Sequence, residues 1–135
     1  MATKWSVPVR VLSHDAKAEK RGLFSAADVA LAASGTVSLE LAANDTPMVI
    51  AYDMAWLSRI IMSRLLLVDT VTLVNLVSES RVVPEFIGKA CQPAPITEAV
   101  LAVLADPSGQ SAAAAVTMDR LGRGAEDPGV RAARA

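Results

Sequence analysis

The chain has 135 residues, of which 53% are hydrophobic and 20% charged, and its formal net charge is −1. This composition is typical of one compact domain and excludes a disordered or fibrous chain. Because the charge is nearly balanced, no basic field exists to attract DNA or RNA, and we expect no nucleic-acid partner.

Cysteine and histidine are almost missing from the chain. Cys91 is the only cysteine and His14 the only histidine, so we expect no disulfide framework, no metal site and a reducing, cytoplasmic setting. The amino terminus has no apolar stretch of signal-peptide length. The most apolar region, residues 54–77, is interrupted by charged residues, so it lacks the roughly 18 uncharged residues of a membrane-spanning helix.

The first half of the chain predicts strands and helices in alternation. Residues 7–12 are rich in β-branched side chains, which favour a strand. Residues 15–27 are polar and predict a helix. Residues 28–34 predict a strand that is apolar on both faces, and residues 36–44 have the apolar spacing of a second helix. A further two-sided strand is expected at residues 47–52.

The second half continues the alternation. We expect a helix at residues 54–68, a short strand at 70–76, a short helical piece at 84–87, and helices at 95–106 and 108–121. Alternating elements with two-sided apolar strands predict an α/β fold, in which a doubly wound parallel sheet lies between helices on both faces.

Three small residues separate the strand expected at 28–34 from the helix that follows it. In such folds ligands bind where strands lead into helix amino termini, and free backbone N–H groups there favour a phosphate. Ser34, Gly35 and Thr36 occupy this position. Glu40, one turn later, shares a face with Thr36 and can accept the hydroxyls of a ribose. The alternatives are that Ser34 or Thr36 only caps the helix and that Glu40 is a solvated glutamate.

Four segments together resemble the carboxyl-terminal half of the lipid-A-disaccharide synthases: "ALAASGTVSLELA", "TPMVIAY", "VTLVNLVSESRVVPEF" and "ITEAVLAVLADP". The resemblance extends from about Val11 to the end of the chain. It implies a GT-B glycosyltransferase, whose Rossmann-like carboxyl-terminal half binds the sugar nucleotide. Such an enzyme inverts the sugar linkage as it transfers 2,3-diacylglucosamine from UDP to 2,3-diacylglucosamine 1-phosphate in lipid A biosynthesis.

The resemblance also implies what residues 1–135 lack. We expect this chain to be a single, partial domain that binds the donor nucleotide, with the acceptor site and the general base in an amino-terminal domain outside it. The chain alone should therefore be inactive. Exchange of carboxyl-terminal segments between two subunits of a homodimer is also implied.

By resemblance, the UDP moiety is held by Ser34, Gly35 and Thr36, and its ribose by Glu40. The sugar nucleotide is the substrate, and no cofactor is expected. Comparable small-residue turns and glutamates occur in other UDP-sugar enzymes. Two alternatives therefore stay open: half of another UDP-sugar transferase or epimerase, and a nucleotide-binding module without chemistry.

The resemblance places Asn75 and Glu85 along the donor cleft, but the sequence departs from the family pattern near both. The proline usual before the asparagine is Val74 here. An arginine often found after the tyrosine of the "PMVIAY" strand is Asp53, and the arginine that precedes "VVPE" is displaced by one place to Arg81. The resemblance therefore carries no phosphate contact over to Asp53 or Arg81, and Asp53 would repel a pyrophosphate unless a cation lay between them.

The helix expected at residues 54–68 carries a tryptophan and two arginines. Trp56, Arg59 and Arg64 beside an apolar face suit the surface of an anionic membrane, which fits lipid substrates and a peripheral place on the inner membrane. The alternative is a packed helix whose arginines extend their charged ends to water.

Overall fold

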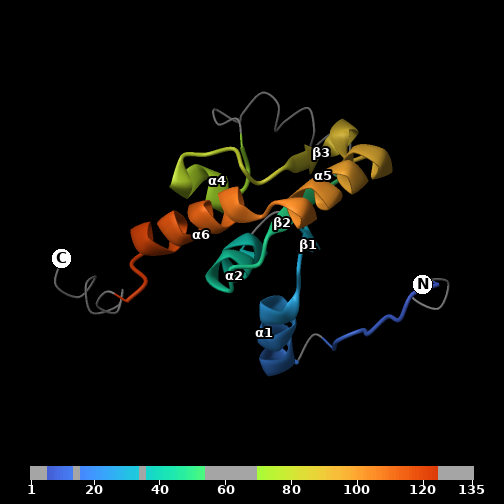
Figure 1. The fold of residues 1–135 in the computed structure, drawn as a ribbon, viewed down its shortest axis with the longest axis horizontal. Coiled ribbons are helices and arrows are strands. Elements are labelled where there is room, and N and C mark those ends of the chain that lie inside the picture. Colours follow the sequence, from blue (N-terminus) through green and yellow to red (C-terminus); the bar gives the residue numbers. More distant parts are fainter. Residues whose placement is uncertain (1–5, 14–15, 34–35, 54–69, 125–135) are drawn as a thin grey trace.

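A computed structural model describes residues 6–13, 16–33, 36–53 and 70–124. Helices and strands alternate along this part of the chain (Figure 1). In chain order the elements are α1 (Lys17–Ala26), β1 (Ala30–Ala32), α2 (Val37–Ala43), β2 (Met48–Tyr52), α4 (Leu73–Ser78), β3 (Glu85–Ile87), the 3-10 helix η2 (Gly88–Ala90), α5 (Pro93–Ala105) and α6 (Ser108–Arg120).

The three strands form one parallel sheet in the order β1-β2-β3. Ala30 lies opposite Met48, and Ile50 lies opposite Glu85. Parallel strands require crossover connections, and α2 provides the one from β1 to β2. The chain therefore advances across the sheet in a single direction, and the fold is the α/β arrangement with a parallel sheet that the sequence predicts.

Helices pack on both faces of the sheet. On one face α2, α4 and α6 contact one another (Figure 1) and enclose a core with Met48 and Ile50 of β2. Val49, between them, is fully buried on the opposite face, where α5 packs against β2. Burying an aliphatic side chain of this size contributes about 1.5–3 kcal/mol, so β2 anchors both layers.

Six elements confirm the sequence prediction, with ends that differ by a few residues: α1, β1, α2, β2, α5 and α6. The sheet is less enclosed than two-sided apolar strands indicate, because β1 lies at its edge and Leu31 is 60% exposed. The helix expected at residues 54–68 lies outside the described residues.

Three predicted elements are wrong. Residues 7–12 have no secondary structure, because no neighbouring strand pairs with them. Residues 70–76 are not a strand, since α4 starts at Leu73, where a carboxylate from a distant residue caps the helix start. Residues 84–87 are not helical: Glu85–Ile87 is β3, held to β2 by ladder bonds such as Ile50 N–H to the Pro84 carbonyl, 2.9 Å.

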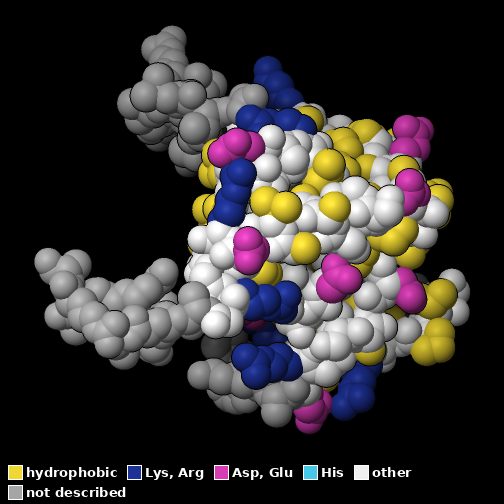
Figure 2. All heavy atoms as spheres, turned by 60° about the vertical axis from the view of Figure 1, so that its left-hand side comes forward, with side chains coloured by type: hydrophobic (Ala, Val, Ile, Leu, Met, Phe, Trp, Pro, Cys, Tyr) yellow, Lys and Arg dark blue, Asp and Glu magenta, His cyan; other side chains and the backbone are white. Residues whose placement is uncertain are grey.

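The surface carries charges of both signs. On the face shown in Figure 2, Lys and Arg lie beside Asp and Glu, with hydrophobic side chains between them. Among the described helices none alone is long and apolar enough to span a bilayer; α5 and α6 together, across their 83° bend, meet the criteria of length and composition only.

Candidate nucleotide-binding edge of the sheet

The carboxyl ends of parallel strands lie at one edge of their sheet, and ligands of doubly wound folds bind outside that edge. Here the edge is formed by the ends of β1, β2 and β3. The segment that leads into α2 follows β1 at this edge. Of the residues predicted to hold UDP, Thr36 and Glu40 are described, and Ser34 and Gly35 lie outside the described residues.

Thr36 stands at the start of α2. Its carbonyl accepts the N–H groups of Leu39 at 3.1 Å and Glu40 at 3.2 Å, and its hydroxyl forms no capping bond to the helix. The capping interpretation therefore does not apply to the Thr36 side chain. Its predicted contact with UDP stays a prediction.

Glu40 forms an ion pair with a residue that the sequence did not single out. Its carboxylate lies 2.6 Å from the Lys20 Nζ, and the two side chains are 49% and 46% exposed. The same ammonium group lies 5.3 Å from the centre of the Phe24 ring. Lys20 lies on α1 and Glu40 on α2, so no spacing in the sequence indicates their contact. The sequence does show that Lys20 and Phe24 are one helical turn apart. Glu40 is accessible, and Lys20 is its present partner.

Glu85 caps the start of α4. One carboxylate oxygen accepts the hydroxyl of Thr70 at 2.7 Å. The other accepts the N–H groups of Val71 at 3.1 Å and Thr72 at 2.6 Å. A negative charge suits the amino end of a helix, and these contacts explain why a half-buried glutamate is tolerated at the beginning of β3.

Asn75 is 1% exposed, and both the nitrogen and the oxygen of its side-chain amide form hydrogen bonds. Its Nδ2 donates to the Val83 carbonyl at 2.9 Å and to the Thr70 Oγ1 at 3.3 Å, while its Oδ1 accepts the Val83 N–H at 3.1 Å. Both amide donors are therefore used within the protein. Asn75 closes the turn between α4 and β3, as a neighbouring strand would.

Thr70 brings the two residues predicted for the donor cleft into one network. Its hydroxyl donates to Glu85 and accepts from Asn75, so the loop before α4, the turn after it and β3 are fixed together. No motif or spacing singled out Thr70. Since α2 contacts α4, this network and the Thr36–Glu40 pair belong to adjacent helices on one face of the sheet. Contact of Asn75 or Glu85 with a donor stays a prediction.

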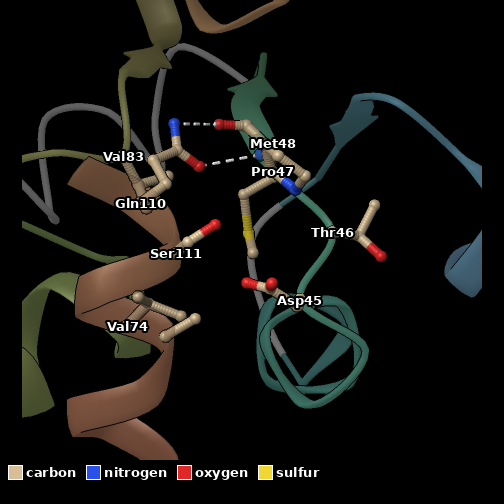
Figure 3. A pocket seen from close by; sticks show the side chains of 9 residues that line it. Asp45, Thr46, Pro47, Met48, Val74, Val83, Gln110 and Ser111 are labelled. Atoms are coloured by element: carbon tan, nitrogen blue, oxygen red, sulfur yellow. Dashed lines mark hydrogen bonds between the residues drawn. The ribbon is translucent and has the colours of Figure 1, made fainter. Parts of the chain in front are cut away.

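A small hollow lies at the opposite, amino-terminal end of β2 (Figure 3). Its volume is about 210 Å³, open solvent included, below the roughly 300–1,000 Å³ of small-molecule sites. The Gln110 amide bonds both peptide groups of Met48, at 2.8 Å to the N–H and 2.9 Å to the carbonyl. Gln110 thus forms with Met48 the hydrogen bonds that a neighbouring strand would form, because β3 pairs with β2 only from Ile50 onward. The residues around the hollow therefore stabilise the fold.

The start of α6 has a perturbed carboxyl group. The Ser108 hydroxyl at 2.6 Å, and after it the Ser108 backbone N–H at 3.0 Å, donate to Asp106 and lower the pKa of its carboxyl below the ordinary 3.8. Hydrogen bonds to the charged form have this effect.

Two further predictions concern metal ions and the membrane surface. Across residues 6–13, 16–33, 36–53 and 70–124, no group of three or more His, Cys, Asp or Glu side chains is arranged to hold a metal ion. Trp56, Arg59 and Arg64 lie outside the described residues.

A parallel sheet with helices on both faces is a Rossmann-like α/β domain of the kind that forms one half of a GT-B glycosyltransferase. A sequence model of the family described as lipid-A-disaccharide synthetase matches residues 2–128. The chain therefore belongs to the lipid-A-disaccharide synthetase family.

Individual relatives agree with the family match. A lipid-A-disaccharide synthase of Ruegeria pomeroyi is 63% identical over 116 residues, which cover 86% of this chain and 29% of the relative. One of Paramagnetospirillum magneticum is 40% identical over 97% of this chain and 34% of the relative. One of Bradyrhizobium diazoefficiens is 43% identical over 75% of this chain and 26% of the relative. The chain thus spans about a third or less of the length of these relatives.

Proposed function

We propose that this chain is the part of a lipid-A-disaccharide synthase that binds the donor nucleotide. The whole enzyme transfers 2,3-diacylglucosamine from UDP to 2,3-diacylglucosamine 1-phosphate, with inversion at the transferred sugar. The observation that carries the proposal is the family match over residues 2–128, together with 63% identity to a synthase. The acceptor site and general base belong to an amino-terminal domain outside these 135 residues.

In this proposal UDP lies across the carboxyl edge of the sheet. The turn of Ser34, Gly35 and Thr36 binds its phosphates, and the Glu40 carboxylate accepts the ribose hydroxyls. Glu40 suits this role because its side chain is about half exposed. An exposed ion pair contributes little to stability, so the ribose can replace Lys20 at small cost. No cofactor takes part, since the sugar nucleotide carries its own leaving group.

The direct test is titration of UDP into the folded chain and into Glu40→Gln. A hydrogen bond to a charged acceptor contributes about 1.5–3 kcal/mol, so the variant should bind UDP roughly ten- to a hundredfold more weakly. Glu19→Gln is the matched control, because Glu19 is also an exposed, ion-paired glutamate, and it should leave the affinity unchanged. Equal affinities for wild type and Glu40→Gln would remove Glu40 from the ribose site.

The lipid substrates imply contact with the inner-membrane surface. We propose that Trp56, Arg59 and Arg64 provide it, as aromatic and basic residues do on anionic bilayers. The test is binding to vesicles that contain anionic lipid, with Trp56→Ala and Arg59→Ala combined. Unchanged vesicle binding would reject the patch. A homodimer with exchanged carboxyl-terminal segments is a further part of the proposal, to be tested by the mass of the particle in solution.

A further inference from the structure

Lys20 is a cation held beside the glutamate that is proposed to bind the ribose. Its Nζ lies 2.6 Å from the Glu40 carboxylate and 5.3 Å from the centre of the Phe24 ring. Phe24 is partly buried against the core, so its ring has a fixed place on α1. The lysine is therefore kept close to Glu40, although both charged side chains are about half exposed.

Two hydrogen bonds fix α1 beside α2. Thr46, which is buried, donates its hydroxyl to the Phe24 carbonyl at 2.7 Å, and Ser25 donates to the Asn44 side chain at 2.9 Å. Lys20 comes before Ser25 on α1, and its partner on α2 likewise comes before that of Ser25. The two helices therefore point in the same direction.

This parallel arrangement directs the lysine toward the start of α2. Side chains of a helix lean toward its amino terminus, so Lys20 leans along α2 from Glu40 in the direction of Thr36. Thr36 precedes Glu40 by one turn on the same helix face, which is about 5.4 Å along the axis. Rotation of the flexible four-carbon stem can carry the ammonium group over this distance while α1 stays in place.

The edge where the donor is proposed to bind has acidic side chains of its own. Glu40 lies there, and Asp53 directly follows the carboxyl end of β2. The diphosphate of a sugar nucleotide adds two further negative charges. Because like charges at short range repel one another, a protein cation is needed to bind the diphosphate. Lys20 is such a cation, and its present ion pair is exposed and weak.

We propose that Lys20 is a further donor-binding residue, whose ammonium group moves from Glu40 to the diphosphate when the sugar nucleotide binds. This inference rests on the proposed function. The ribose hydroxyls take the Glu40 carboxylate, and the released ammonium donates its N–H groups to phosphate oxygens beside Thr36. An ammonium group suits this role because it has a full positive charge and three donors.

The movement gives Lys20 opposite effects on two kinds of ligand. With a ligand that has phosphates, the ammonium gains a partner and strengthens binding. With a nucleoside that has none, the ammonium only competes with the ribose for Glu40. A lysine that merely attached α1 to α2 would affect both ligands in the same way.

Titration of UDP and of uridine into the whole chain and into Lys20→Met tests the proposal. Methionine keeps an aliphatic side chain beside Phe24 and removes the charge. The variant should bind UDP about tenfold more weakly, because contacts to a charged group are lost, and should bind uridine at least as tightly as wild type. Higher salt should weaken UDP binding more in wild type than in the variant. Lys20→Arg, which keeps the charge, should retain most of the affinity for UDP.

Arg120→Met is the matched control. Arg120 is also a cation paired with a glutamate: it lies 3.0 Å from the Glu79 carboxylate, and its side chain is 45% exposed, compared with 46% for Lys20. Arg123, close by on the chain, donates to the Ala43 carbonyl at the end of α2. The control therefore removes the same charge near the opposite end of α2, and it should leave the affinity for UDP unchanged.

The outcomes separate this inference from the proposed function. Weaker binding of UDP by Lys20→Met, without weaker binding of uridine, supports the inference. Equal or tighter binding of UDP by this variant overturns it, and so does an equal loss for both ligands. If Glu40→Gln weakens UDP binding and Lys20→Met does not, the proposed function stands and only the role of Lys20 falls. A folded wild-type chain that takes up no UDP overturns both.

Discussion

Replacement of Asn75 by alanine should strongly destabilise the domain. The Asn75 amide is the partner of both peptide groups of Val83, at 2.9 and 3.1 Å, in a site where Asn75 is 1% exposed. A buried polar group left without a partner costs about 1–3 kcal/mol. Two such groups give a loss of about 2–6 kcal/mol, a large part of the roughly 5–15 kcal/mol of a typical domain. Thr70 loses its bond from Asn75 but still donates to Glu85, so it adds little to the loss of stability.

Urea unfolding of wild type and Asn75→Ala measures this loss. With a slope of about 1–3 kcal/mol per molar urea, the midpoint should fall by about 1 M or more. Asn44→Ala is the matched control. Asn44 lies near the surface, donates to the Glu40 carbonyl at 2.7 Å and accepts the Ser25 hydroxyl at 2.9 Å, and water can replace it at both exposed partners. This substitution should cost about 0.5–1.5 kcal/mol. An Asn75→Ala midpoint within error of wild type, with weaker UDP binding, would refute the reasoning and assign Asn75 to the nucleotide.

Two further substitutions test the helix starts. Glu85→Ala removes the acceptor for the N–H groups of Val71 and Thr72. It should lower the free energy of unfolding by about 1–3 kcal/mol and speed hydrogen exchange at the start of α4. Unchanged exchange there would contradict the capping role. Asp106→Ala should lower the melting temperature at neutral pH. Because the folded pKa is depressed, the carboxylate stabilises the fold above the unfolded pKa, and the advantage of wild type should vanish as pH falls below 3.8 through the folded pKa. A difference that persists at low pH would contradict this origin.

The sequence predicted the elements whose pattern is local. The apolar run after Pro47 predicts a buried strand, and this strand is β2. The apolar spacing around Leu41 predicts the helix α2. The parallel sheet followed from their alternation. The helices α5 and α6 were also predictable, because a helix forms its backbone hydrogen bonds within one segment and its sequence pattern is local.

Errors occurred where distant contacts decide the structure. Residues from Thr70 onward look like a strand, yet α4 begins at Leu73, and Glu85 of β3 accepts the N–H groups of Val71 and Thr72 just before it. Glu85 itself looked helical and is in β3 because Ile50 supplies the neighbouring strand. Tertiary contacts override local preference in both cases.

The candidate site shows the same division. Glu40 was recognisable from its position one turn after Thr36, whereas Lys20 was not, because its contact joins two helices. Asn75 and Glu85 were singled out by resemblance alone. The structure adds that both hold the backbone around α4, a role that no sequence spacing revealed.

The most direct measurement of the central claim is disaccharide formation by a chimera. In the chimera, the part of the Ruegeria pomeroyi synthase that aligns with this chain is replaced by the 116 aligned residues of this chain, to which it is 63% identical. The chimera should release UDP and form the disaccharide, and Glu40→Gln in the chimera should raise the concentration of donor required for half-maximal rate. A folded chimera that forms no disaccharide, or one whose donor requirement is unaffected by Glu40→Gln, would contradict the account.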